Sequence, residues 1–201
     1  MRLFRKKKQK VEGSKRVSVA AFYEDITLRE WCAWHQARTD MARLCAALSI
    51  TEDEARQIPT EQAKKVLEIF GNAVKAETMV DRVRVDLKGK QYGMIPDLTA
   101  ITLGEHVDLV NNVKKDNLYI TLPKAVAILY RPVTKVLGGK YDIEPYDHKK
   151  HLSADNLEAI GDMPMNVVAG ASLFFSTICK ELSANLELSL VKELRQTMKE
   201  I

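Results

Sequence analysis

The sequence predicts a mainly helical (α+β) fold: a helical domain with one β-hairpin and room for a third short strand. Three observations predict it. Apolar residues recur at three- and four-residue intervals along most of the chain. Capping boxes of the form Thr-x-x-Glu begin several of these segments. Only residues 82–96 alternate apolar and polar side chains over enough positions to predict a pair of strands.

Composition limits the class of protein. The chain has 201 residues, of which 46% are hydrophobic and 29% charged, as in ordinary globular proteins. Its 3 cysteines lie far apart, which excludes a disulfide framework. The first residues lack the apolar core of a secretory signal, so an intracellular protein is expected.

Basic residues are concentrated at one end of the chain. Residues 1–16 hold eight basic side chains and one carboxylate, Glu12, whereas the whole chain has a net charge of only +4. A cationic segment attracts phosphate, so this basic tail is a candidate nucleic-acid contact. A solvated terminus and a nuclear localisation signal are the alternatives. The candidate DNA-binding residues are Arg2, Arg5, Lys6, Lys7, Lys8 and Lys10.

The first folded segment is predicted over residues 17–80. Residues 17–20 alternate and could form a short strand. Capping boxes at Thr27 and Thr51 begin a helix over residues 28–48 and a short helix that stops before Pro59. A longer helix begins at Thr60.

The second segment, residues 81–201, begins with the hairpin, in which Lys88-Gly89 turns the chain. A hairpin is unstable alone, so it must lie on helices or on the strand at residues 17–20. We expect the two segments to form one compact unit. Further helices are predicted over residues 103–113 (after a capping box at Thr102), 122–130, 155–161, 164–184 and 186–200.

Two features of this segment are candidate partner-binding sites. Residues 131–155 are predicted to be a long loop that carries Tyr141 and Tyr146, and loops of that length are often functional. The terminal helix has an apolar stripe of Leu190, Leu194 and Met198, which either folds back on the core or binds a partner helix. Residues 163–179 carry no charge but include polar residues, which predicts a buried core helix and not a membrane span.

The sequence contains few residue patterns that are typical of catalytic sites. His148 and His151 beside Asp147 could hold a metal, but the lysines between them disfavour a cation, and solvated surface histidines are expected. Cys32, His35 and Cys45 are expected in the core. No phosphate-binding loop, nucleophile elbow or HExxH motif is present. We therefore expect no metal, no cofactor and no enzymatic activity, with a metal-dependent enzyme as the least favoured alternative.

Two stretches resemble proteins of long-tailed bacteriophages. The phrase Leu48-Ser49-Ile50-Thr51-Glu52-Asp53-Glu54-Ala55-Arg56-Gln57-Ile58-Pro59 resembles tail assembly chaperones, although Ser49-Ile50 replaces the usual Thr-Gly. Residues 95–109, followed by Ala127-Ile128-Leu129-Tyr130-Arg131-Pro132, resemble small proteins of phage structural-gene clusters.

The resemblance implies a non-enzymatic assembly protein that acts by protein–protein contacts. Its implied partners are phage tail, capsid or portal proteins, and a homo-oligomer is left open. The alternative is a virion component, such as a neck, portal-vertex or packaged cargo protein, whose basic tail contacts DNA. The expected location is the host cytoplasm or the virion, without membrane contact.

Overall fold

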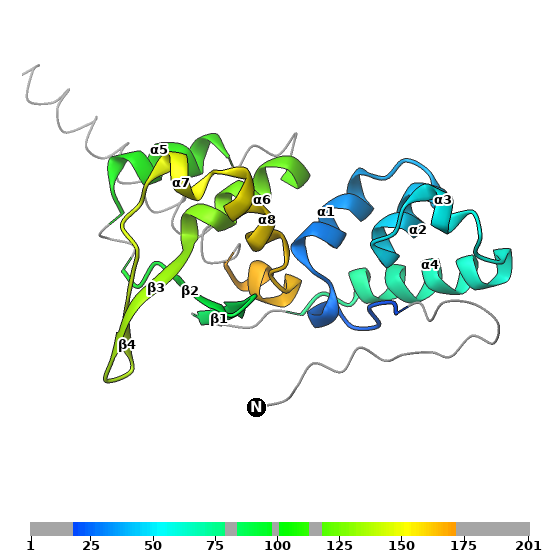
Figure 1. The fold of residues 1–201 in the computed structure, drawn as a ribbon, viewed down its shortest axis with the longest axis horizontal. Coiled ribbons are helices and arrows are strands. Elements are labelled where there is room, and N and C mark those ends of the chain that lie inside the picture. Colours follow the sequence, from blue (N-terminus) through cyan, green and yellow to red (C-terminus); the bar gives the residue numbers. More distant parts are fainter. Residues whose placement is uncertain (1–17, 79–83, 98–100, 113–117, 172–201) are drawn as a thin grey trace, which may run out of the picture.

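The computed structural model describes residues 18–78, 84–97, 101–112 and 118–171. Within them the chain is mainly helical with one small antiparallel sheet, so the predicted fold class is confirmed. Helices α1 to α4 lie on one side of the molecule, and the sheet with α5 to α8 lies on the other (Figure 1). The basic tail and the stripe of Leu190, Leu194 and Met198 lie outside the described residues.

The predicted helix over residues 28–48 is wrong as a single element. A 3-10 turn, Tyr23–Asp25, precedes α1 (Leu28–Gln36), and the chain then breaks before α2 (Asp40–Leu48). Ala37 is extended, and the Thr39 hydroxyl accepts the Ala42 N–H at 3.2 Å as an N-cap. The apolar spacing continues across the break, because α1 buries Leu28 and Cys32 and α2 buries Leu44 and Leu48, and this continuity masked the new helix start.

The remaining N-terminal helices follow the prediction closely. Helix α3 spans only Glu52–Ala55, and α4 spans Thr60–Lys75. The capping boxes at Thr27 and Thr51 are both formed, as is the third at Thr102. In each, the threonine hydroxyl accepts an amide hydrogen and the glutamate carboxylate accepts one in return, so three helix starts are satisfied locally.

The predicted hairpin is confirmed as β1 (Arg84–Leu87) and β2 (Lys90–Met94). Lys88 and Gly89 both have positive φ, 50° and 81°, as a two-residue hairpin turn of the right twist requires. Val85 and Leu87 of the hairpin share one core with residues of the helices, Phe70 and Ala127 among them. In the described part of residues 17–20, Ser18 forms a bridge and no strand follows it.

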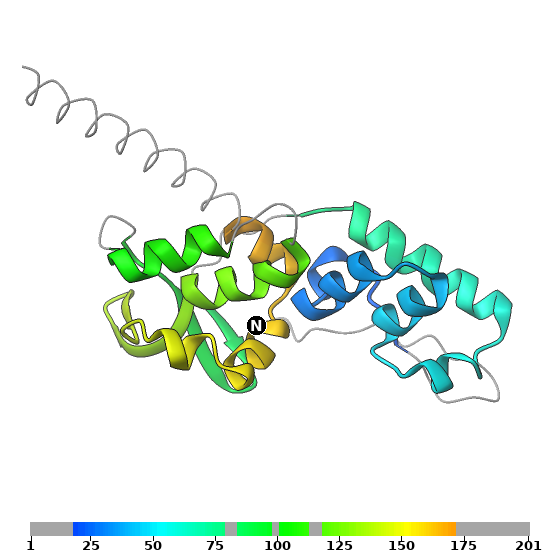
Figure 2. The same cartoon turned by 90° about the horizontal axis from the view of Figure 1, so that it is seen from above.

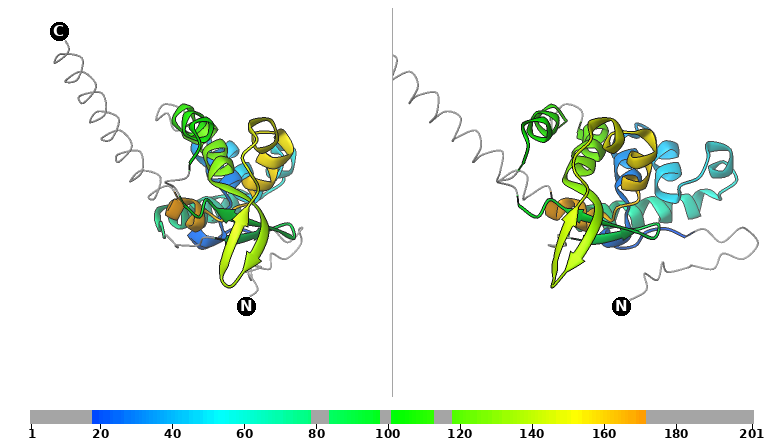
Figure 3. Two further views of the ribbon diagram at one scale, coloured as in Figure 1. Left: turned by 90° about the vertical axis from the view of Figure 1, so that its left-hand side faces the viewer. Right: turned by 60° about the vertical axis from the view of Figure 1, so that its left-hand side comes forward.

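The predicted loop over residues 131–155 is wrong. Strand β3 (Tyr130–Leu137) pairs with β2, and β4 (Lys140–Ile143) pairs with β3, giving an antiparallel sheet in the order β1-β2-β3-β4. Gly138 and Gly139, with φ of 57° and 84°, form a second hairpin turn. This hairpin extends away from the helices in both views of Figure 3. Two short helices complete the stretch, α7 (His148–His151) and α8 (Ala154–Gly161).

Helices α5 (Leu103–Asn111) and α6 (Leu118–Leu129) pack against each other. They lie side by side when the molecule is seen from above (Figure 2). Helix α6 begins earlier than predicted and continues directly into β3. Its second half is buried throughout, since Ala125 to Leu129 are each less than 5% exposed.

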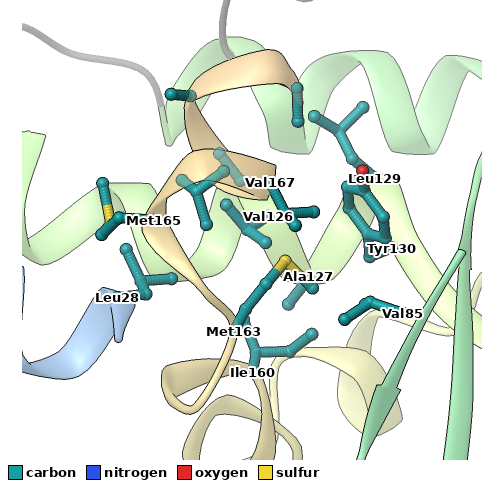
Figure 4. Close-up of a cluster of buried hydrophobic side chains, with 14 of the residues drawn as sticks. Leu28, Val85, Val126, Ala127, Leu129, Tyr130, Ile160, Met163, Met165 and Val167 are labelled. Carbon is teal, nitrogen blue, oxygen red and sulfur yellow. The ribbon is translucent and has the colours of Figure 1, made fainter. Parts of the chain in front are cut away.

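The main core lies between α6, the sheet and the segment after α8. Figure 4 shows Met163 and Ile160 against Ala127 and Val126, with Val85 approaching from β1. Residues 165–171 are helical and almost all buried, which confirms the described part of the predicted uncharged core helix. The same core includes Phe70 and Ala73 of α4. A smaller cluster beneath α2, α3 and α4 is centred on Leu44, Leu48 and Ala55.

Candidate protein interaction site on helix α5

Helix α5 is oriented with its acidic side inward and its apolar side outward. The carboxylates Glu105 and Asp108 point to the protein, whereas Leu103, Val107 and Val110 are 78%, 46% and 50% exposed. Residues spaced by four and three positions share one face of a helix, so these three side chains form a continuous apolar stripe. We call this stripe the α5 outer face.

The inward side of α5 is fixed by one buried ion pair. Arg131 at the start of β3 places its Nη2 2.7 Å from Glu105 Oε1, and the two side chains are 7% and 4% exposed. The other carboxylate oxygen of Glu105, Oε2, accepts the N–H and the hydroxyl of Thr102, at 2.7 and 2.6 Å. Burial lowers the pKa of Arg131, and the adjacent Glu105 opposes that shift. Both oxygens of Glu105 are therefore satisfied in a buried setting.

A second inward contact connects α5 to Tyr146 and to His148 of α7. Asp108 Oδ2 accepts the Tyr146 hydroxyl at 2.7 Å and lies 2.8 Å from His148 Nδ1. These hydrogen bonds, from His148 first and then Tyr146, hold the pKa of Asp108 below its ordinary value. Burial, and then the hydrogen bond to Asp108, raise the pKa of Tyr146. Leu109 adds the one fully buried apolar side chain of α5.

A polar cluster continues behind this contact. The ring of Tyr146 stacks on His151 with 5.6 Å between the ring centroids, and the Arg131 guanidinium lies over the Tyr146 ring, 5.9 Å from its centroid. His151 Nε2 is 3.5 Å from Glu144 Oε2, and Lys150 also pairs with Glu144. The contact with Lys150 lowers the pKa of Glu144. This cluster joins α5, β3 and α7 through polar groups.

The predicted surface histidines differ from each other. His148 is exposed, but His151 is 1% exposed, so the prediction is wrong for His151. The reason is its position at the end of α7, where its ring enters the space beneath Tyr146. Among the described residues, no group of three or more histidine, cysteine or acidic side chains is placed to hold a metal.

The predicted partner-binding tyrosines are both engaged within the chain. Tyr141 lies over Gly93 and donates its hydroxyl to the Met94 carbonyl at 2.6 Å. Tyr146 takes part in the cluster described above. Both remain half-buried, and their role toward a partner stays a prediction.

The predicted core residues on α1 and α2 are only partly buried. Cys32 is buried, and burial raises its pKa to about 12, but His35 is exposed and Cys45 lies between these extremes. His35 stacks on Tyr119 with an interplanar angle of 2°. The expected core position is thus correct for Cys32 and wrong for His35, which lies at the junction of α1 and α6.

Sequence reasoning missed the α5 outer face although it recognised the helix. The i, i+3 pair of Glu105 and Asp108 and the opposite stripe of Leu103, Val107 and Val110 are both visible in the sequence. Periodicity separates two faces but does not say which one is buried. The missing signal was Arg131, a buried cation that attracts the acidic face inward.

Comparisons with known proteins add no relative: no family model, curated protein or solved structure matches this chain. Within the described residues, no helix combines the length and apolar character needed to cross a bilayer.

Proposed function

We propose that this protein is a non-enzymatic bacteriophage assembly protein that acts by protein–protein contacts, in the manner of a tail assembly chaperone. The observation that carries the proposal is the α5 outer face, three apolar side chains on a helix whose charges are turned inward. Contiguous exposed apolar surface is typical of interaction sites. The phage context rests on the resemblance of residues 48–59 and 95–109 to proteins of phage structural-gene clusters.

The proposed mechanism is the shielding of an apolar surface on a phage structural protein until that protein is incorporated. A helix that offers apolar side chains at four- and three-residue spacing fits a groove or a second helix on its partner. Turning Glu105 and Asp108 inward keeps charge off this face, so the partner's apolar surface meets no carboxylate that it would have to desolvate. The side chains thus act by shape and apolar contact, and no residue is assigned to bond-making chemistry.

The experiment is co-expression of the full chain with the phage structural proteins encoded beside it. We expect the wild-type chain to keep a tail or capsid protein in the soluble fraction, and Val107→Glu to lose this effect. Leu137→Glu is the matched control, because Leu137 is 71% exposed on the β3–β4 hairpin and lies outside α5. If no structural protein gains solubility with the wild-type chain, the proposal is overturned.

A second candidate is a virion component that contacts DNA. The observation that favours it is the run of basic residues within positions 1–16. Mass spectrometry of purified particles separates the two functions, since a chaperone is absent from them and a virion component is present. Deleting residues 2–16 should remove salt-sensitive retention on DNA, and unchanged retention would refute the DNA contact.

A further inference from the structure

We propose that the α5 outer face pairs with the same face of a second copy of this chain, with the helices antiparallel and a two-fold axis near Val107. The inference rests on the proposed function, because it names one partner of the same interaction surface. Two copies would therefore associate through α5 and not through the sheet or the helices of the N-terminal side.

The apolar stripe of α5 is nearly symmetric about Val107. Leu103 and Val110 lie four and three positions from Val107, so Val107 is close to the centre of the exposed apolar surface. An antiparallel pair centred there sets Val107 against Val107 of the second copy and Leu103 against Val110 of the second copy. The stripe is therefore nearly complementary to itself, as a two-fold contact requires.

The charged side chains of α5 lie away from the proposed two-fold axis. A two-fold contact brings each residue near its own copy, so any charged side chain close to the axis meets a like charge. The charged residues of α5 avoid this, because Glu105 pairs with Arg131 and Asp108 contacts Tyr146 and His148. The stripe is flanked by Gly104 and Asn111 on one side and by the half-buried His106 on the other, and no acidic or basic side chain of Asp, Glu, Lys or Arg lies among these positions.

A second helix can approach the α5 outer face closely beside Gly104. Gly104 is exposed, and apart from its chain neighbours and the backbone of α5 itself nothing lies within 4 Å of where its Cβ would be. A small residue beside an apolar stripe lets a second helix approach its backbone closely. Ile120 of α6, the helix that packs against α5, is a further exposed apolar side chain, at 59%.

The small size of the α5 outer face limits the expected affinity of the dimer. Stable interfaces bury about 800 Å² on each partner and involve roughly 20–30 residues a side. The four apolar side chains of α5 and α6 offer much less than this. We therefore expect a weak dimer whose population depends on protein concentration in the micromolar range or above, which suits a protein that must release its surface to another partner.

Sedimentation equilibrium of the full chain over a hundred-fold range of concentration tests the pairing. We expect the wild-type protein to shift from monomer to dimer. Val107→Glu and Val107→Lys should each remain monomeric at every concentration, because each variant sets like charges against each other at the axis. Leu137→Glu should dimerise like the wild type.

A one-to-one mixture of Val107→Glu and Val107→Lys is the decisive sample. Opposite charges then meet across the axis, and we expect dimers to return in the mixture although neither variant forms them alone. This rescue cannot come from misfolding of a variant. Wild-type protein that stays monomeric throughout, variants that dimerise as strongly as the wild type, or a mixture that stays monomeric would each overturn the inference.

Failure of this inference is distinguishable from failure of the proposed function. A monomeric wild-type chain that still keeps a phage structural protein soluble overturns the self-pairing alone. A wild-type chain that dimerises through Val107 but protects no structural protein upholds the self-pairing and overturns the proposed function.

Discussion

Arg131 and Glu105 form an ion pair of 2.7 Å between Nη2 and Oε1, and both side chains are more than nine-tenths buried. Buried ion pairs contribute little net stability when compared with apolar replacements, because both charges must be desolvated. A buried ion pair can instead specify a single packing arrangement of the elements that carry its two charges. Here the pair selects which side of α5 faces the protein and thereby leaves the apolar stripe outside.

Replacing one partner of the ion pair between Arg131 and Glu105 should lower the free energy of unfolding. Arg131→Met leaves the Glu105 carboxylate buried without its cation, so we expect a loss of about 3–5 kcal/mol in the free energy of unfolding. Urea titration followed by circular dichroism measures it.

The matched control is the double variant Arg131→Met with Glu105→Gln. The glutamine keeps an acceptor for Thr102 and carries no charge, so the double variant should be more stable than Arg131→Met alone. A single variant within about 0.5 kcal/mol of the wild type would show that the pair does not hold α5.

The contact of Asp108 with Tyr146 and His148 should make stability fall in acid. The folded state holds the pKa of Asp108 below its ordinary value of 3.8. A depressed carboxyl pKa stabilises the fold above the ordinary value, and this contribution disappears as the pH falls through the folded pKa. We therefore expect the difference in unfolding free energy between wild type and Asp108→Asn to be largest above about pH 5 and to shrink as the pH drops below 3.8.

Urea midpoints from neutral pH down to acid measure this dependence. Tyr146→Phe is a useful comparison, since it removes one of the two donors to Asp108 Oδ2 and should reduce the pH dependence without abolishing it. A difference that stays constant over the whole series would contradict the linkage.

Local signals in the sequence predicted much of the fold, and long-range contacts account for what they missed. The capping boxes at Thr27, Thr51 and Thr102 identified helix starts because their hydrogen bonds span three residues. The second hairpin was missed although Gly138-Gly139 signalled its turn, because Pro132 and the exposed end of β3 hide the alternation of a strand.

The candidate site was less predictable than the fold. The outward orientation of α5 depends on Arg131, which is 26 residues away along the chain from Glu105. Single-sequence patterns carry no information on which distant cation meets which carboxylate. Tyr146 is predicted from the sequence as a partner contact, whereas its contacts with Asp108 and His151 emerge only from the tertiary structure.

The break between α1 and α2 can be tested at its cap. Thr39→Ala removes the hydroxyl that accepts the Ala42 N–H, so we expect a loss of about 0.5–2 kcal/mol in the free energy of unfolding. Thr39→Ser retains a hydroxyl at the same place and should lose much less. Thermal unfolding of the three proteins measures the effect, and an unchanged midpoint for Thr39→Ala would argue for a helix that runs through residue 39.

Gly93 should tolerate no side chain, whereas Gly104 should accept one. A Cβ at Gly93 would lie 2.5 Å from Cε2 of Tyr141 and 3.0 Å from Cγ2 of Val133, so the Tyr141 ring would have to leave its place and give up its hydrogen bond to the Met94 carbonyl. We expect Gly93→Ala to cost about 1–3 kcal/mol in unfolding free energy, as overpacking does.

Gly104→Ala is the contrasting change, because its Cβ meets open space and alanine favours a helix by up to about 1 kcal/mol over glycine. Tyr141→Ser in the Gly93→Ala background removes the ring that the new methyl group meets. The cost of Gly93→Ala should therefore be much smaller in that background than in the wild type, and a double-mutant cycle of chemical denaturation curves measures the coupling. Equal costs in the two backgrounds would show that Tyr141 does not rest on the sheet at Gly93, and its ring would then be free to contact a partner.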